Sequence, residues 1–265
     1  MNTMKPAVLI VDDNKDILEF IADDLIEKYA VIKAMNGQDA LKILGEQTVH
    51  LIITDVMMPV MDGFELCRQI KSSFEFSHIP VIILTAKNTL QSKIEGLELG
   101  ADAYIEKPFY PEHLQVQIAN LLSNRHKIKE FFASSPLAHI NTMAYSKTDE
   151  QFLEQLNEAI YRNIENSELQ VDDLAGTMNM SRATLYRKIK EISNLSPADL
   201  INVARLKKAA EIMAAYDYKI YEVAEMVGFS SPTTFTRNFL KQFNISPSEY
   251  TNLKHTERKN NKPGS

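Results

Sequence analysis

The stretch from residue 51 to residue 63 reads LIITDVMMPVMDG: a short apolar run, expected to be a strand at residues 51–54, is followed by Asp55 and a turn. Near-continuous apolar runs bounded by turns are typical of strands buried on both faces, and their alternation with helical patterns indicates right-handed crossovers. The pattern predicts an α/β fold with a doubly wound, five-stranded parallel sheet. The other four strands are expected at residues 8–11, 30–34, 81–84 and 103–105.

Polar side chains follow four of these strands. Asp12 and Asp13 follow the first, while Asp55, Thr85 and Lys107 follow the third, fourth and fifth. Ligands of open parallel sheets bind outside the carboxyl ends of the strands, and a carboxylate there can carry a phosphoryl group if cations neutralise the charge. We therefore predict Asp55 as the nucleophile. Taken singly, these residues are also ordinary strand-end residues, and Asp13 or Asn14 could cap the next helix.

A magnesium ion is also expected at the predicted site. Mg²⁺ prefers oxygen ligands and combines a few carboxylates with phosphate oxygens and water. Its expected ligands are Asp12, Asp13, Asp55 and the backbone carbonyl of Met57. The Lys107 ammonium and the Thr85 hydroxyl would then donate hydrogen bonds to the phosphoryl oxygens.

The acidic pair, the string DVMMPVMDG, an LTA and a YIEKP occur in this order at the strand ends. With these motifs, residues 5–123 resemble the response-regulator receiver family, which implies a flavodoxin-like fold and a histidine kinase as phosphodonor. The resemblance implies these roles: Asp55 as the phosphorylated residue, Asp12 and Asp13 as metal-binding acids, Thr85 and Tyr104 as a switch pair, and Lys107 as the phosphate-sensing lysine.

Two alternatives concern the chemistry of this half. Phosphohydrolases with an aspartyl nucleophile place a second Asp two residues on, whereas Met57 stands two residues after Asp55, so we do not expect an enzyme. The other alternative is a receiver used only as a phosphorelay intermediate, beside a phosphate-independent helical interaction module. The Lys107–Pro108 bond is expected to be cis.

The second half contains an internal repeat of about 50 residues. The sequence DLA at 173–175 aligns with EVA at 222–224, and NLSP at 194–197 aligns with NISP at 244–247. Each copy predicts a helix, a tight turn and a second helix, so this half is expected to be an all-α domain with two helix-turn-helix units. The helices are expected at residues 171–178 and 181–192 and at residues 220–227 and 231–243, joined by a long helix from residue 197 to about residue 215.

The second helix of a helix-turn-helix enters the major groove, where one face reads base edges and contacts phosphates. The strings NMSRATLYRKIK and VAEMVGFSSPTTFTRNFLKQF resemble the AraC-type DNA-binding domain over residues 152–251. Residues 180–265 carry a charge of +6 and residues 1–179 a charge of −12, which permits phosphate contact in the second half. The predicted DNA contacts are Ser181, Arg182, Tyr186, Arg187 and Lys190 in the first copy, and Ser231, Thr233, Thr234, Thr236, Arg237 and Lys241 in the second.

A heptad-like stripe starts near Pro111 and crosses the expected end of the first domain. One interpretation is a last helix packed on the sheet, followed by a linker; the other is a dimer seam that Arg125 weakens. The stripe consists of Leu114, Ile118, Leu121, Arg125, Ile128 and Phe132. The expected domains are a receiver at 1–124, a helical extension and linker at 125–150, a DNA-binding domain at 151–255 and a flexible tail at 256–265.

The remaining features concern location and partners. No apolar run approaches the roughly 18 residues needed to span a bilayer, and the single cysteine, Cys67, fits a reducing compartment, so we expect a cytoplasmic protein without membrane contact. The two halves together resemble the output half of a hybrid two-component sensor, or a stand-alone regulator of that kind. The expected partners are a histidine kinase, in trans or in a missing N-terminal portion, double-stranded DNA, a second copy in a phosphorylation-dependent homodimer, and RNA polymerase.

Overall fold

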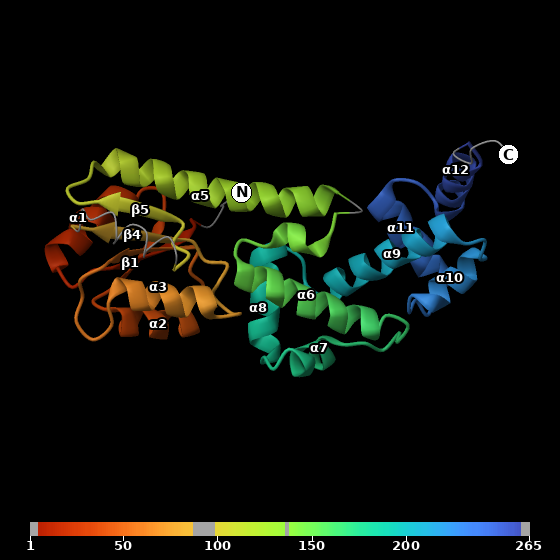
Figure 1. Cartoon of the computed structure of the whole chain (residues 1–265), viewed down its shortest axis with the longest axis horizontal. Coiled ribbons are helices and arrows are strands. Elements are labelled where there is room, and N and C mark those ends of the chain that lie inside the picture. Colours follow the sequence, from red (N-terminus) through yellow and green to blue (C-terminus); the bar gives the residue numbers. More distant parts are fainter. Residues whose placement is uncertain (1–4, 87–98, 136–137, 261–265) are drawn as a thin grey trace. The chain divides into compact units, whose positions relative to one another are not determined.

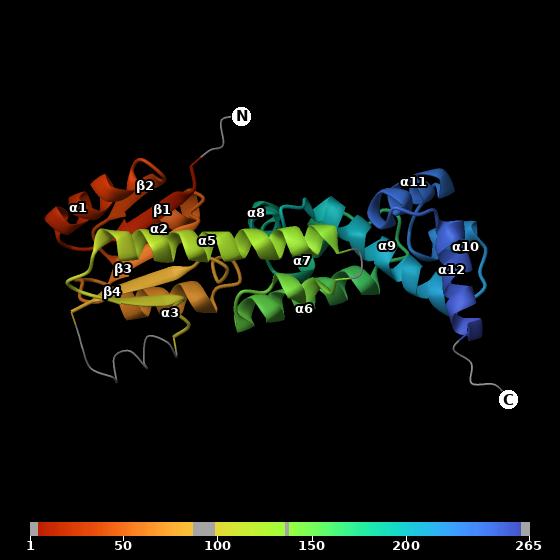
Figure 2. The same cartoon turned by 90° about the horizontal axis from the view of Figure 1, so that it is seen from above.

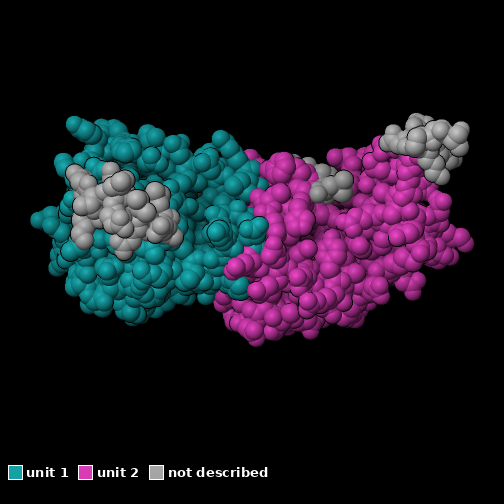
Figure 3. Space-filling view, in the orientation of Figure 1, with its two compact units in different colours: residues 1–128, 144–150 teal, residues 129–143, 151–265 magenta. Residues whose placement is uncertain are grey.

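The computed structural model of the chain describes residues 5–86, 99–135 and 138–260. The chain divides into two compact units (Figure 3). Unit 1 comprises residues 1–128 and 144–150, and unit 2 comprises residues 129–143 and 151–265. Two helices, those numbered α5 and α6 in Figure 1, therefore have residues in both units.

Unit 1 is built on the predicted five-stranded parallel sheet, whose strand order is β2-β1-β3-β4-β5. The central strands β3 and β4 are fully buried, as their apolar sequences require. Both run one residue further than predicted, so that Asp55 and Thr85 are the last residues of their strands. The strands are β1 (Ala7–Val11), β2 (Ala30–Ala34), β3 (Leu51–Asp55), β4 (Val81–Thr85) and β5 (Ala103–Glu106).

Helices cover both faces of the sheet (Figures 1 and 2). Helices α1 (Lys15–Leu25) and α5 (Pro111–Ser134) bury Leu18, Ile21 and Ile118 against one face. Helices α2 (Gly37–Glu46) and α3 (Gly63–Ser72) cover the other face. Helix α1 is capped by Asn14, whose side chain accepts hydrogen bonds from two backbone N–H groups of the first turn.

Unit 2 confirms the predicted duplication. Each copy is a short helix, a turn and a longer helix, and each longer helix ends at an asparagine in the left-handed conformation, Asn194 or Asn244 with φ of 61°. The elements are η1 (Ile140–Met143), α6 (Lys147–Arg162), α7 (Val171–Thr177), α8 (Arg182–Ser193), α9 (Pro197–Ala215), α10 (Ile220–Met226), α11 (Pro232–Phe243) and α12 (Pro247–Asn260). Helix α12 thus continues into the predicted tail.

The long helix α9 is the centre of the second copy's core. Leu206 and Met213 of α9 pack with Phe235 and Phe239 of α11, and all four side chains are buried. The ring of Phe239 stacks on that of Phe243 at 4.3 Å between centroids and meets Tyr250 edge-on at 5.5 Å. The inward aromatic face of α11 therefore fixes which side chains of this helix point to solvent.

The heptad-like stripe of α5 packs within its own chain. Leu114 and Ile118 are buried in unit 1, and Phe132 is buried in unit 2. Arg125 does not interrupt an apolar seam; its guanidinium lies 3.2 Å from the Asp102 carboxylate and is mostly buried. These positions thus have intramolecular partners. None of the described helices combines the length and apolar character that a membrane crossing requires.

Candidate functional site

Three of the predicted site residues converge at the carboxyl ends of the strands in unit 1. The Lys107 ammonium lies 2.8 Å from an Asp12 carboxylate oxygen and 2.7 Å from an Asp55 oxygen. Asp12 follows β1 and Asp55 ends β3, and these strands are neighbours in the sheet. Asp12 is 2% exposed and Asp55 8% exposed, so two carboxylates share one cation away from bulk water.

The backbone around Lys107 holds its side chain over the sheet edge. The Lys107 N–H donates to the Thr85 carbonyl at 2.8 Å, which extends the β4–β5 pairing by one hydrogen bond. The Lys107–Pro108 peptide bond is cis, as predicted. Burial alone would lower the pKa of the Lys107 ammonium, but the hydrogen bonds to Asp12 and Asp55 outweigh this and raise that pKa above its ordinary value. Lys107 is therefore a permanent cation at this edge.

The oxygen donors present fit Mg²⁺ in kind, because carboxylates are its preferred protein ligands. Asp12 and Asp55 converge, but Asp13 is exposed, and the described residues do not bring three acids, histidines or cysteines together as a metal cluster. The Met57 N–H donates to the second Asp55 oxygen at 2.6 Å. The structure thus assembles two of the three predicted acids around Lys107, and Mg²⁺ binding stays a prediction.

The predicted switch pair lies on neighbouring strands. Thr85 is 1% exposed at the end of β4, and Tyr104 lies on β5. The Tyr104 ring packs against the core under α2 and α3, and its buried hydroxyl has no hydrogen-bond partner among the described residues. An unsatisfied buried hydroxyl costs free energy, so this side chain would gain from a rearrangement that supplies a partner.

Gly63 is a packing residue beside Asp55 that was not among the predicted site residues. It begins α3, and its N–H donates to the Val56 carbonyl at 3.0 Å. A Cβ atom at this position would lie 2.0 Å from the Asp55 carbonyl oxygen, a distance that no real side chain reaches. The strand end that carries Asp55 can therefore pack against α3 only because residue 63 has no side chain. In the sequence, the Asp62-Gly63 pair after the turn could have indicated a position that needs a residue without a side chain.

Some of the outward residues of α8 form ion pairs or hydrogen bonds within unit 2. Arg182 forms an ion pair with Asp172 at 2.8 Å, and the Lys190 ammonium donates to the Asn194 carbonyl at 2.6 Å. Ser181 caps the helix by accepting from the Thr184 N–H. Tyr186 is 47% exposed, whereas Arg187 is partly buried. Ser181, Arg182 and Lys190, which are predicted DNA contacts, therefore have a structural role as well.

The outward face of α11 is less engaged. Ser231 caps the helix by accepting from the Thr234 N–H at 3.3 Å, and Thr233 and Thr236 are exposed. Arg237 and Lys241 are also exposed. Among the described residues, neither of these two cations forms a side-chain hydrogen bond or an ion pair. The second copy therefore presents two cations and a row of hydroxyls that are available for an external ligand.

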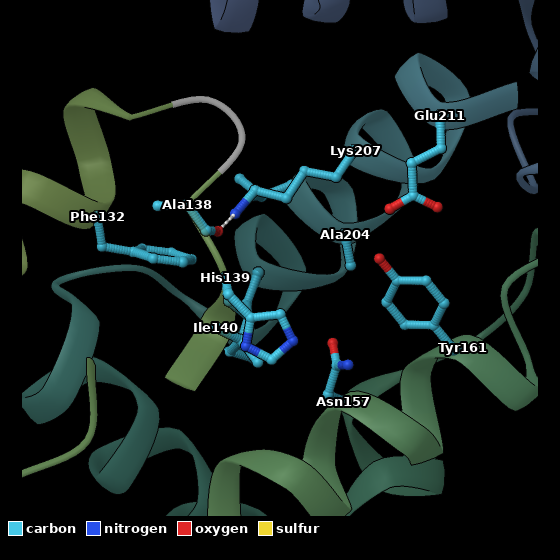
Figure 4. Close-up of a pocket in the computed structure, with 11 residues that line it drawn as sticks. Phe132, Ala138, His139, Ile140, Asn157, Tyr161, Ala204, Lys207 and Glu211 are labelled. Carbon is cyan, nitrogen blue, oxygen red and sulfur yellow. Dashed lines mark hydrogen bonds between the residues drawn. The ribbon is translucent and has the colours of Figure 1, made fainter. Parts of the chain in front are cut away.

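Unit 2 also has a partly open pocket of about 90 Å³ between α6, α9 and residues 138–140 (Figure 4). The Lys207 ammonium crosses its upper edge, donates to the Ala138 carbonyl and lies 4.4 Å from the centre of the Phe132 ring. Burial lowers the pKa of Lys207 to about 8. The partly buried Lys207 side chain thus connects α9 to the backbone at Ala138.

The pKa of Lys207 predicts how pH affects the stability of unit 2. Because the folded-state pKa is about 8 and the ordinary value is 10.5, the unfolded chain binds this proton more tightly. The free energy of unfolding should therefore rise as pH increases from about 8 towards 10.5, and this contribution should be absent in Lys207→Met. Urea unfolding between pH 7 and pH 10 measures it, with Lys208→Met as the control. An identical pH dependence in Lys207→Met and the wild type would contradict the prediction.

Comparison with known proteins agrees with this architecture. Residues 8–119 match the family described as response regulator receiver domain, and residues 174–252 match a helix-turn-helix domain. A signal receiver domain of a signal transduction histidine kinase from Syntrophus aciditrophicus is 37% identical, with a TM-score of 0.43, over 45% of this chain and 91% of that structure.

Two curated relatives extend over more of the chain. "Histidine kinase P4" of Formosa agariphila is 39% identical over 248 residues, which are 94% of this chain but only 18% of that protein. "Probable transcriptional regulator ycf27" of Guillardia theta is 30% identical over 188 residues, which are 70% of this chain and 73% of that protein. The chain therefore belongs to the response regulator family, with a receiver domain followed by a helix-turn-helix domain of the AraC type.

Proposed function

We propose that the chain is a transcription regulator whose sequence-specific DNA binding is controlled by phosphorylation of Asp55. The observation that carries this proposal is the pair of buried carboxylates, Asp12 and Asp55, that share the Lys107 ammonium in a chain with two helix-turn-helix units. The phosphodonor would be a histidine kinase, in trans or in a longer form of this protein. The proposed location is the cytoplasm, where such a regulator reaches both DNA and kinase.

The chemistry follows from the surroundings of Asp55. One of its carboxylate oxygens would form a bond to phosphorus while the bond from phosphorus to the donor's histidine nitrogen breaks. Lys107 already lies at hydrogen-bond distance from Asp55, so its ammonium would be held beside the incoming phosphoryl oxygens. Bound Mg²⁺, held by Asp12, Asp13, Asp55 and the Met57 carbonyl, would supply further positive charge.

The switch hypothesis assigns Thr85 and Tyr104 to the step after phosphorylation. The Thr85 hydroxyl would donate to the phosphoryl group, and Tyr104 would move as Thr85 moves. The buried Tyr104 hydroxyl, which has no hydrogen-bond partner among the described residues, supports this role, because a new partner would lower its free energy. A homodimer that forms on phosphorylation is the proposed consequence, and RNA polymerase is a further proposed partner once the regulator is on DNA.

For DNA binding, the second copy offers the sharper test. Arg237→Ala should weaken binding to a specific duplex by about 1–3 kcal/mol if Arg237 reads a base, and should reduce the salt dependence if it contacts phosphate. Arg187→Ala tests the first copy in the same way. Mobility-shift titrations at several salt concentrations, with a duplex selected from a random library by the wild-type protein, distinguish these roles.

The matched control is Arg162→Ala, which removes an exposed arginine of α6 that pairs with Glu158 at 2.8 Å. Its affinity for the selected duplex should equal that of the wild type. The assignment of α8 and α11 as recognition helices fails if both Arg187→Ala and Arg237→Ala bind as tightly as this control.

A further inference from the structure

Residues 144–150, here called the docked segment, lie in the stretch expected to be linker, yet they belong to unit 1. The Ser77 hydroxyl donates to the Asp149 carboxylate at 2.6 Å, the Thr148 hydroxyl donates to the Lys71 carbonyl at 2.7 Å, and the Tyr145 hydroxyl donates to the Arg125 carbonyl at 3.0 Å. These partners come from α3, from the loop after it and from α5. Three parts of the receiver therefore form hydrogen bonds with this segment.

The site that receives Asp149 is buried and specific. Asp149 and Ser77 are both fully buried, and a buried carboxylate is tolerated only where its oxygens have partners. One Asp149 oxygen accepts from Ser77, and the other accepts from the Tyr145 N–H at 3.2 Å. The Asp149 N–H in turn donates to Ser146, so the first turn of α6 is capped inside the receiver.

A second contact connects the docked segment to strand β5. The Arg125 guanidinium lies 4.2 Å from the centre of the Tyr145 ring and 3.2 Å from Asp102, the residue before β5. Asp102 also accepts from Lys71 at 2.5 Å and from the Val81 N–H at 2.9 Å. At its other end, β5 leads directly into Lys107. The docked segment is thus linked, through Arg125 and Asp102, to the start of the strand whose other end leads into the candidate phosphoryl site.

Helix α6 begins in the docked segment and continues into unit 2, where Phe152, Leu153 and Leu156 are buried in the helical core. Because α6 is one continuous helix, backbone hydrogen bonds between residues four positions apart join its first turn to the residues that follow. The same helix therefore contains contacts of the receiver at one end and core residues of the DNA-binding unit further along.

We propose that the docked segment is the contact through which the receiver controls DNA binding. In this proposal, phosphorylation changes the strength with which Ser77, Lys71 and Arg125 hold the docked segment, and this change sets the DNA affinity. The inference rests on the proposed function and adds the transmitting element to it. Weakening the docking contacts should then leave phosphoryl uptake intact but make the DNA affinity independent of phosphorylation.

The test uses the full chain with Ser77→Ala and Thr148→Val, which remove one docking hydrogen bond each. Their matched controls are Ser72→Ala and Thr142→Val, whose hydroxyls bond to Gln69 and His139 outside the docked segment. Acetyl phosphate with Mg²⁺ loads each protein, intact mass verifies loading, and the affinity for the selected duplex is measured in both states. In the wild type and the controls, the two affinities should differ by about 5- to 150-fold. In both docking variants, this ratio should fall below about 2-fold.

Hydrogen exchange of residues 144–150 provides a readout that does not depend on DNA. Phosphorylation should change the exchange rate of these amides in the wild type, whereas in Ser77→Ala and Thr148→Val they should exchange fast in both states. The inference is overturned if the docking variants retain the full phosphorylation response, or if exchange in the loaded wild type is unchanged. If the loaded wild type shows no change in DNA affinity, the proposed function fails instead, and the exchange rates still decide whether docking responds.

Discussion

Asp55→Asn is expected to abolish phosphoryl uptake. Incubation of the wild type with Mg²⁺ and acetyl phosphate should add ~80 Da to the intact mass, and the variant should gain nothing, because an amide has no anionic oxygen to attack phosphorus. Asparagine has nearly the shape of aspartate, and its oxygen can still accept from the Lys107 ammonium or the Met57 N–H. The loss should therefore reflect chemistry rather than misfolding.

Asp62→Asn is the matched control for this experiment. Asp62 lies seven residues after Asp55 and caps α3 by accepting from the Glu65 N–H at 2.8 Å. Asparagine is as good an N-cap as aspartate, so this variant should fold and take up phosphoryl like the wild type. A mass gain of the same size in Asp55→Asn would show that another residue is the acceptor.

Gly228→Ala is expected to lower the free energy of unfolding of unit 2 by about 2–4 kcal/mol. Gly228 has φ of +77°, a conformation that costs free energy for a residue with a Cβ atom, and that atom would lie 2.4 Å from the Ile164 carbonyl oxygen. The Ile164 oxygen belongs to the backbone and not to the end of a flexible side chain, so the contact cannot be relieved cheaply. Urea unfolding followed by circular dichroism measures the loss.

Two variants separate the causes of this effect. Gly176→Ala, in the first copy, meets no atom within 4 Å and should be neutral or stabilising by up to about 1 kcal/mol. Gly228→Asn tolerates positive φ better than alanine does but retains the Cβ contact, and it should still be clearly destabilised. Equal stabilities of Gly228→Ala and Gly176→Ala would show that the Ile164 carbonyl does not restrict this turn.

The convergence of Asp12, Asp55 and Lys107 could be predicted because it depends on a simple rule. Each residue follows or ends an apolar run, and parallel strands bring their carboxyl ends to one edge of the sheet. The repeat in the second half could also be predicted, since each copy has an asparagine at the end of its longer helix. The positions of these residues could therefore be predicted, because they depend only on local sequence pattern and strand topology.

The position of residues 144–150 could not be predicted in this way. The bonds from Ser77 to Asp149 and from Thr148 to Lys71 join residues 72 and 77 positions apart, and the segment has no periodicity that reveals a buried face. The ion pair of Arg125 could not be predicted for a related reason. Its heptad position suggested only a charge within an apolar stripe, because its partner Asp102 lies 23 residues away in the sequence. Long-range pairs of single polar groups leave no repeating signal in the sequence.

The measurement that tests the central claim most directly is the affinity of the full chain for its selected duplex, before and after loading with phosphoryl, at one fixed salt concentration. The account predicts that the two dissociation constants differ by about 5- to 150-fold in the wild type and are equal in Asp55→Asn. Equal dissociation constants for the two states of the wild type, with intact mass proving that Asp55 is loaded, would contradict phosphorylation-controlled DNA binding.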